Sequence, residues 1–539
     1  MKNEILVIKL LTHSQISDIQ LIARKARWGK EIVENEGKQK NRGERHQTKN
    51  HSPKRGGKIM RKICEPQLKL GQIPIEDIVF DLRSRDEITE LLLSFQAIYT
   101  NRDLRKEVFE ILQKMTPPHV DRKNGRPGMD WWAVFLLGTL RLVCNWDFDK
   151  LVEIANNHIR LRMMLFHTLE DDFSYALRTV AGNIALLTPE ILDELNRVIV
   201  KHGHILVGKR PEEALFGSAD SFPLETNVHF PTDIGILFDA LRKIITLIPR
   251  IDLDGWRKWR ELTKKAKRLW LRSQKSKNRS AKTEKAKAEL GEQIIKAHLE
   301  YIGYARTIVE RAVGTLSTLE TDIVTCLRAE EVWKHVGHAN RQIDQIERRI
   351  VNGESIPHAE KVFSIFEEHT RWIKKGKAGV PQQLGLNVCV VKDQYGFILH
   401  HRVMESETDD KIAVPIIRET IDRFPEFSGC SFDRGFHSPA NQKALSAILK
   451  QVVLPRKGKL AKDAREIENT AEFKDRRRKH AAVESSIAAL ANHGLDRCPD
   501  HGVTGFKRYV AIGILARNMQ MVGHIIREKE RKRLKRLAA

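Results

Sequence analysis

Apolar residues recur every three or four positions through residues 60–205, which predicts a helical N-terminal region. Leu104, Val108 and Ile111 share one helix face, and a Pro-Pro pair follows that helix. Asp130 is the expected N-cap of the next helices, which are joined by a short turn at 145–147. This arrangement has the form of a helix-turn-helix DNA reader. Any small helical bundle gives the same periodicity, so both interpretations stay open.

The central part of the chain changes from a strand pattern to a long polar helical block. A strand is expected at ALFGSAD, and Thr232 is the expected cap of the helix that follows. Residues 251–351 are rich in helix formers and charge and have the character of an insertion. Their lysines are plausible DNA contacts. The interspersed tryptophans belong to the core of a helical hairpin or stack on bases, and we favour the core: Trp256, Trp259 and Trp270.

From residue 383 the period becomes that of strands. LGLNVCVV and FILHHRVM flank the turn KDQYG, which predicts a β-hairpin with Gly396 at positive φ. A helix, the strand GCSFD, a helix beginning at Ser438 and Pro439, and the strand VVLP follow. A basic loop then leads to a single helix at 476–492. With the insertion removed, this is the element order of a ribonuclease-H-like core. The predicted fold class is mixed α/β.

These patterns divide the chain into six predicted regions. They are a basic arm at 1–59, a helical DNA-binding domain at 60–205, the first part of the ribonuclease-H-like core at 206–232, a helical insertion at 233–375, the rest of the core at 376–525 and a basic tail at 526–539. The arm has almost no large apolar side chains and cannot bury enough surface to order itself. It is a DNA-binding arm, a solvated tail or an over-extended start, with Met60 as the favoured initiator.

Three acidic residues stand out by their place in this order. Asp220 and Asp433 are each expected where a short strand ends, and Glu484 is expected on a helix. Carboxylates from two strand ends and a helix converge readily on a pair of Mg²⁺ or Mn²⁺ ions, which prefer oxygen ligands. Such a pair supports phosphoryl transfer. Asp233 and Asp239 are rivals, but Asp233 is better explained as helix N-terminal charge.

Composition favours a polyanionic partner inside the cell. The formal net charge is +24 and the pI about 9.7, as expected for a nucleic-acid-binding protein. Six scattered cysteines form no CxxC pair, which predicts reduced thiols and a cytoplasmic location. No apolar run reaches membrane-spanning length.

Three segments resemble the DDE transposases of bacterial insertion sequences: DSFPLETNVHFPTDIGILFDALR, SFDRGFHSPANQKAL and HAAVESSIAALANHGLDRCPDHGVTGFKRYVAIGILARN. The segment GRPGMDWWAVFLLGTLRLVCNWDFDKLVEIANN is similar to the helical N-terminal domain of that family. The resemblance implies that Asp220, Asp433 and Glu484 form a catalytic triad holding two divalent ions. It also implies binding to terminal inverted repeats, strand transfer to target DNA without a covalent enzyme intermediate, and a nucleoid-associated protein. Synapsis of two DNA ends suggests at least a dimer.

The chain departs from the family after the glutamate, where some relatives carry a basic residue and this chain has Ala488 and Ala491. Phosphate binding is therefore expected from Arg476, Arg477 or Arg478, or from the loop that contains Lys457 and Lys459. Two further DNA contacts are expected: Arg434 on the DNA backbone and Arg126, in the segment GRP, in a minor groove. Two alternatives stay open. One is an inactive, element-derived DNA-binding protein, and the other is a two-metal DNA nuclease that stops at hydrolysis.

Overall fold

The computed structural model describes residues 59–64, 70–116, 126–168, 170–252, 254–318, 323–374, 382–458 and 462–538. Lys459 and nearly all of the predicted arm at 1–59 lie outside these residues. The chain divides into two compact units. The helical unit is Phe230–Ile365, and the sheet unit is formed by Arg55–His229 together with Phe366–Ala539. No helix among the described residues has the length and apolar character needed to cross a membrane.

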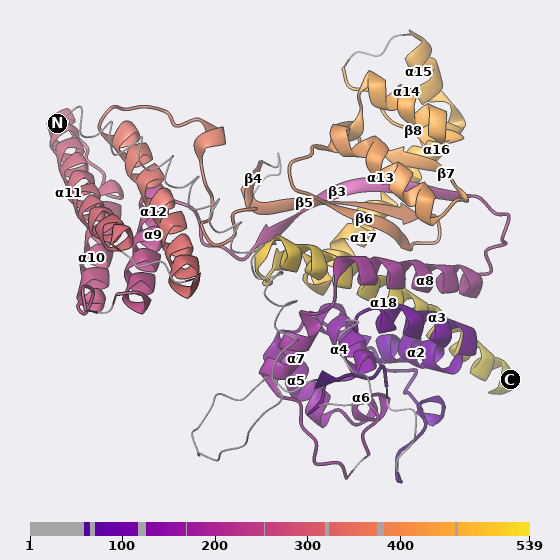
Figure 1. The fold of residues 1–539 in the computed structure, drawn as a ribbon. Helices are drawn as coiled ribbons and strands as arrows, with labels where there is room; N and C mark the ends of the chain where they lie inside the picture. Colours follow the sequence, from indigo (N-terminus) through magenta and orange to yellow (C-terminus); the bar gives the residue numbers. More distant parts are fainter. Residues whose placement is uncertain are drawn as a thin grey trace, which may run out of the picture. The chain divides into compact units, whose positions relative to one another are not determined.

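A mixed sheet of seven described strands forms the centre of the sheet unit (Figure 1). β3 (Leu215–Thr226) lies between β5 (Gln382–Asp393), which is antiparallel to it, and β7 (Phe427–Phe432), which is parallel. Four further strands extend the sheet: β6 (Ile398–Met404) and β4 (Arg371–Lys374) on β5, β8 (Gln451–Val453) on β7, and β9 (Arg497–Cys498) on β3. The predicted mixed α/β class is confirmed.

The predicted hairpin is present as β5 and β6. Gly396 has φ 98° in the connecting turn, a backbone conformation that favours glycine. Asp393 stabilises the same turn, because its Oδ1 accepts hydrogen bonds from the N–H groups of Tyr395 and Phe397, both at 2.9 Å. The turn fixes the register in which Val390 lies opposite His401.

Two long helices, α8 (Pro189–Val207) and α18 (Gly502–Ala538), lie side by side and pack against β6 (Figure 1). Thr188 caps α8 and Pro189 occupies its first turn, as the sequence predicts. The predicted tail at 526–539 continues α18 through Ala538. Glutamate–arginine pairs three residues apart support this extension, for example Arg533 and Glu530.

The N-terminal helices share one hydrophobic core with the sheet, and this core extends from Ile75 to Val522. The helices are α2 (Glu87–Thr100), α3 (Arg102–Gln113), α4 (Trp131–Val143), α5 (Phe148–Asn157), α6 (Ile159–Met164) and α7 (Leu177–Ile184). Every residue of α4 is buried. Residues 60–205 therefore pack as part of the sheet unit, because α4 has no face left for solvent.

Five helices connect or follow the C-terminal strands: α13 (Asp409–Arg423), α14 (Pro439–Ile448), α15 (Lys462–Asn469), α16 (Ala471–His480) and α17 (Ala482–Leu490). Two predictions are wrong here. The segment expected to be a basic loop contains α15, whose apolar and charged positions alternate with helical period. The single helix expected at 476–492 is divided at Ala481, where α16 packs on β7 and β8 while α17 packs on β3.

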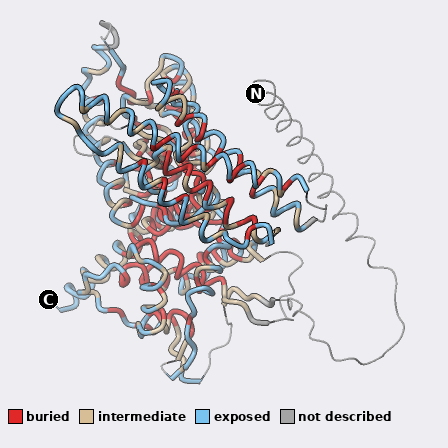
Figure 2. The backbone as a smooth tube through the Cα atoms, turned by 90° about the vertical axis from the view of Figure 1, so that its left-hand side faces the viewer, coloured by how far each residue is buried: buried red, intermediate tan, exposed pale blue. Residues whose placement is uncertain are grey.

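The helical unit contains α9 (Asp233–Leu247), α10 (Trp259–Lys277), α11 (Glu284–Ser317) and α12 (Ile323–Ile350). Its described helices bury one face each, while exposed positions follow their outer faces (Figure 2). Trp256 is fully buried, and Trp259 and Trp270 pack against the same core, so the core interpretation of the tryptophans is confirmed. The unit ends at Ile365, and Arg371–Lys374 already belongs to the sheet as β4.

Candidate functional site

Asp220 lies within β3, and the expectation that its strand ends there is wrong. β3 continues to Thr226 because the antiparallel partner β5 still pairs with it, from Asp220 opposite Val390 to Glu225 opposite Gly385. The parallel pairing with β7 does end at this point, with Ala219 opposite Phe432. An aspartate follows each member of this last pair: Asp220 follows Ala219, and Asp433 follows Phe432. The end of β7 therefore brings the two carboxylates together.

Asp220 lies within electrostatic reach of Asp433 and Glu484, and these three residues are here called the acidic trio. Burial raises the pKa of Asp220 to about 6, and the negative charges of Asp433, Asp409 and Glu484 act in the same direction. The Ser221 N–H donates to Asp220 Oδ1 at 2.8 Å and opposes this shift. Asp433 and Glu484 are exposed, whereas Asp220 is half-buried. Residues more than two hundred positions apart thus converge around the middle of β3.

Asp409, which the sequence analysis missed, is a fourth carboxylate beside the trio. It is the first residue of α13, and its Oδ1 accepts a hydrogen bond from Ser221 Oγ at 2.7 Å. A Cβ placed on Gly435 would come within 2.9 Å of its Oδ2, so the segment after Asp433 also passes close to it. An aspartate at a helix start is ordinarily explained by helix polarity. The sequence signal that could have pointed to Asp409 was the acidic pair Asp409–Asp410 directly after Thr408.

α17 carries Glu484 and is tied to the sheet by a lysine. Lys392 Nζ on β5 donates to the carbonyl oxygen of Ala482 at 2.8 Å. His480, at the end of α16, interacts electrostatically with Asp433 and Glu484, and its Nδ1 lies 3.0 Å from Ser431 Oγ. Burial nevertheless lowers the pKa of His480, so it adds no positive charge at neutral pH.

The trio has the donor chemistry of a divalent-cation site. Within the part of the chain that the structure describes, no lysine, arginine or histidine forms a salt bridge with Asp220, Asp409, Asp433 or Glu484. Their mutual repulsion is what a divalent cation would relieve, and carboxylate oxygens suit Mg²⁺ and Mn²⁺. These residues therefore fit such ions. As the side chains stand, the trio is too widely spaced for a single ion to contact all three.

The predicted DNA-binding residues differ in how they are placed. Arg434, Arg477 and Arg478 are exposed on the segments that carry the trio or lead to it. Lys457 is also exposed, and its Nζ donates to the carbonyl oxygen of Gly435 at 3.0 Å.

The three other predicted contacts are less available or not described. The guanidinium carbon of Arg476 lies 4.0 Å from the centre of the Phe216 ring, so this side chain packs on β3. Arg126 lies in the short strand β2 (Arg126–Pro127), paired with β1 (Ile59–Met60), and its side chain is outside the described part, as is Lys459.

A second group with metal-ligating atoms lies where α8 and α13 meet β6. Atoms of Asp193, His400 and His401 all lie within 4.8 Å of one another. Side chains of the chain itself already contact its carboxylates: Arg423 Nε donates to Asp193 Oδ2 at 2.8 Å, and His400 Nε2 lies 2.9 Å from Glu419 Oε2. We interpret these five residues as a structural ion-pair network, here called the edge network.

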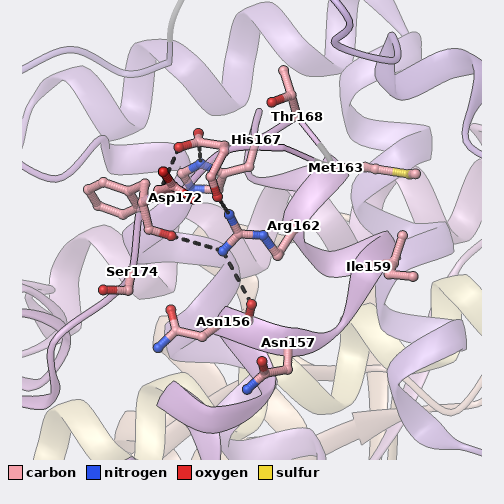
Figure 3. A pocket seen from close by; sticks show the side chains of 11 residues that line it. Asn156, Asn157, Ile159, Arg162, Met163, His167, Thr168, Asp172 and Ser174 are labelled. Atoms are coloured by element: carbon pink, nitrogen blue, oxygen red, sulfur yellow. Dashed lines mark hydrogen bonds and ion pairs between the residues drawn. The ribbon is translucent and has the colours of Figure 1, made fainter.

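The cavity drawn in Figure 3 lies among the N-terminal helices and has a volume of about 400 Å³. Its polar groups hold the loop that follows α6. The Arg162 guanidinium donates to the carbonyl oxygens of Asn156, Asp171 and Phe173 at 3.3, 2.6 and 3.0 Å. His167 Nδ1 lies 2.7 Å from Asp171 Oδ2. Because these groups are engaged with the loop itself, we assign the cavity a structural role.

The turn predicted at 145–147 is present, with Asn145 at φ 49° between α4 and α5. In a helix-turn-helix reader the second helix presents its outer face to the major groove. The exposed face of α5 carries Asp149 and Glu153 beside Lys150. Two acids on this face oppose close approach to phosphates, which weakens the helix-turn-helix interpretation of α5.

No protein-family model, curated protein or solved structure matches the chain.

Proposed function

We propose that the chain is a transposase that binds the ends of a DNA element and catalyses metal-dependent strand cleavage and strand transfer. The observation that carries the proposal is the convergence of Asp220, Asp433 and Glu484, with the raised pKa of Asp220 as its electrostatic sign. Clustered titratable groups with perturbed pKa values are typical of functional sites. The segments that bear these three residues are also those that resemble the DDE transposases.

The strand order supports a ribonuclease-H-like core. β6, β5 and β3 are consecutive antiparallel neighbours, and β7 and β8 follow in parallel on the other side of β3. With the helical unit as an insertion after β3, this is the order expected from the sequence. Asp220 then lies on the central strand and Asp433 after its parallel neighbour, while α17 packs on β3 to carry Glu484.

In the proposed site the acidic trio would hold two Mg²⁺ or Mn²⁺ ions, which supply activation of the attacking hydroxyl and charge stabilisation at the phosphate. The chain's own residues orient the ligands and the DNA. Ser221 links Asp409 to the strand beside Asp220, and Lys392 fixes the helix of Glu484. Arg434 and Arg477 are exposed and positioned to bind the DNA backbone. Because synapsis holds two DNA ends at once, the proposed assembly contains at least two copies of the chain.

An excision assay tests the proposal. A reporter plasmid carries the gene with its flanking DNA, and excision is measured for Asp220→Asn, Asp433→Asn and Glu484→Gln. We expect excision to fall to background in each variant, while a gel shift still detects binding to the element ends. Glu466→Gln, an exposed glutamate of α15, is the matched control and should excise normally.

Normal excision in the three trio variants would overturn the site assignment. Cleavage of the ends without joining to target DNA would instead favour the two-metal nuclease. End binding without any cleavage by the wild-type chain would favour an inactive, element-derived DNA-binding protein.

A further inference from the structure

The helical unit has an open groove of about 870 Å³ between α10 and α11. Basic side chains dominate its lining, and none of its lining residues is acidic. The cations come mainly from α10 and from the residues that follow it, and Lys296 of α11 faces them: Lys264, Lys267, Arg268, Arg272, Lys275, Arg279 and Lys296. All seven are exposed.

Their spacing places the α10 cations along one helix face. Lys264, Lys267 or Arg268, Arg272 and Lys275 follow one another at intervals of three to five residues. From Lys264 to Lys275 the helix rises about 16 Å at 1.5 Å per residue. That length corresponds to about five base-pair steps of duplex DNA. The row of charges therefore matches the backbone of one strand over several nucleotides.

Few of these charges are neutralised by the chain itself. Arg272 pairs with Glu300 at 2.7 Å, and Arg279 donates to Gln293 Oε1 at 3.4 Å. Among the described residues, the remaining groove cations form no salt bridge: Lys264, Lys267, Arg268, Lys275 and Lys296. A concave surface lined by one sign of charge concentrates the field and attracts the opposite charge.

The floor of the groove indicates what it does not bind. Ser273 Oγ donates to the carbonyl oxygen of Ala297 at 3.1 Å, which brings α10 and α11 close together with small side chains. The nearby tryptophans, Trp259 and Trp270, pack into the core and leave no aromatic lining on which bases stack. The groove offers cations and hydrogen-bond donors to phosphates and offers no surface for base readout.

We propose that this groove binds the phosphate backbone of duplex DNA without sequence preference. The choice of DNA as the polyanion rests on the proposed function, whereas the phosphate preference rests on the groove. In a transposase such a contact holds DNA outside the recognised ends, either the flanking duplex or the target.

The test compares two sets of substitutions with equal charge change in the full-length protein. The groove set is Lys264→Gln, Lys267→Gln, Lys275→Gln and Lys296→Gln. The control set, in the same unit but outside the groove lining, is Lys258→Gln, Lys282→Gln, Lys285→Gln and Lys361→Gln. Binding to a random-sequence duplex that lacks the element ends is measured by fluorescence anisotropy across salt concentrations.

We expect the groove set to weaken binding at least tenfold at low salt and to reduce the slope of log K against log salt by about three to four, since each phosphate contact contributes about 0.9. The control set should change affinity less than twofold. Equal losses in both sets, or tighter binding to poly-glutamate than to the duplex, would overturn the proposal. Hydrogen exchange on the wild-type chain gives a second readout: the duplex should protect 264–279, and unchanged exchange there would contradict the proposal.

Cleavage plays no part in this assay, so its outcome is separable from that of the proposed function. A chain that excises DNA but lacks groove binding would refute the groove alone. A chain that binds through the groove but never cleaves would refute the proposed function alone.

Discussion

The acidic trio and the edge network are two carboxylate clusters on the same sheet, and they differ in how their charge is compensated. In the edge network, contacts with His400 and Arg423 hold the pKa of Asp193 well below its usual range, although burial acts in the opposite direction. In the trio, burial and neighbouring carboxylates raise the pKa of Asp220 to about 6. A cluster neutralised by its own chain stabilises the fold. A cluster that the chain leaves without cationic partners suits an external cation and is a better candidate for function.

The largest expected effect in this comparison is on stability at the edge network. Asp193→Ala removes the partner of Arg423 and His400, and leaving a partly buried cation unpaired is costly. Since the Asp193 and Arg423 side chains are 22% and 27% exposed, we expect a loss of about 2 kcal/mol in the free energy of unfolding. Urea denaturation measures it, with Glu466→Ala as the surface control. A loss as small as the control's would show that the network is not structural.

A smaller effect is expected at Asp409, which we interpret as a positioning residue. Asp409→Ala removes the acceptor for Ser221 Oγ, and we expect single-turnover DNA cleavage to fall about tenfold, or about 1.4 kcal/mol in barrier. Ser221→Ala should give a similar loss, while Asp409→Asn, which retains an acceptor oxygen, should be nearly normal. If Asp409→Asn is as inactive as the trio variants, Asp409 is a ligand and the trio is incomplete.

The trio should show the opposite stability effect from the edge network. Asp220→Asn removes a half-buried charge that faces three other carboxylates, so in buffer with chelator we expect the protein to become more stable by about 1 kcal/mol. Thermal denaturation with and without chelator measures the change. A clear destabilisation would mean that the Asp220 carboxylate is already compensated within the fold.

A further effect concerns pH. Burial, followed by the positive charge of His400, lowers the pKa of His401 to about 4, while Asp193 raises it and Arg423 lowers it. The unfolded chain, with a histidine pKa near 6.5, then binds a proton that the folded chain does not. The contribution of neutral His401 to the free energy of unfolding is therefore fully present above pH 6.5 and is lost as the pH drops towards 4. Between pH 6.5 and 5, the free energy of unfolding should fall less in His401→Gln than in the wild-type chain. Equal falls in the two proteins would contradict the lowered pKa of His401.

The sequence predicted those features that depend on local pattern. The hairpin of β5 and β6 follows from alternating apolar residues and Gly396, and the start of α8 follows from Thr188 and Pro189. The mixed α/β class and the core placement of the tryptophans were predictable for the same reason. Local periodicity is read directly from neighbouring residues.

Features that depend on pairing between distant segments were not predictable. The extent of β3 beyond Asp220 is set by β5, which lies more than 150 residues later. The division of the helix before Glu484 is set by packing on different strands, and the role of Asp409 depends on Ser221. The N-terminal helices and the sheet share one core, which the sequence did not predict. The apolar pattern of the helices would be the same if they formed a separate domain with a core of its own.

Manganese binding measured by electron paramagnetic resonance distinguishes the acidic trio from the edge network as the metal site. We expect the wild-type chain to take up about two ions, with less uptake in Asp220→Asn, Asp433→Asn and Glu484→Gln and unchanged uptake in Asp193→Asn and His401→Gln. Uptake that survives the trio substitutions but disappears with Asp193→Asn or His401→Gln would place the metal site in the edge network and rule out the trio.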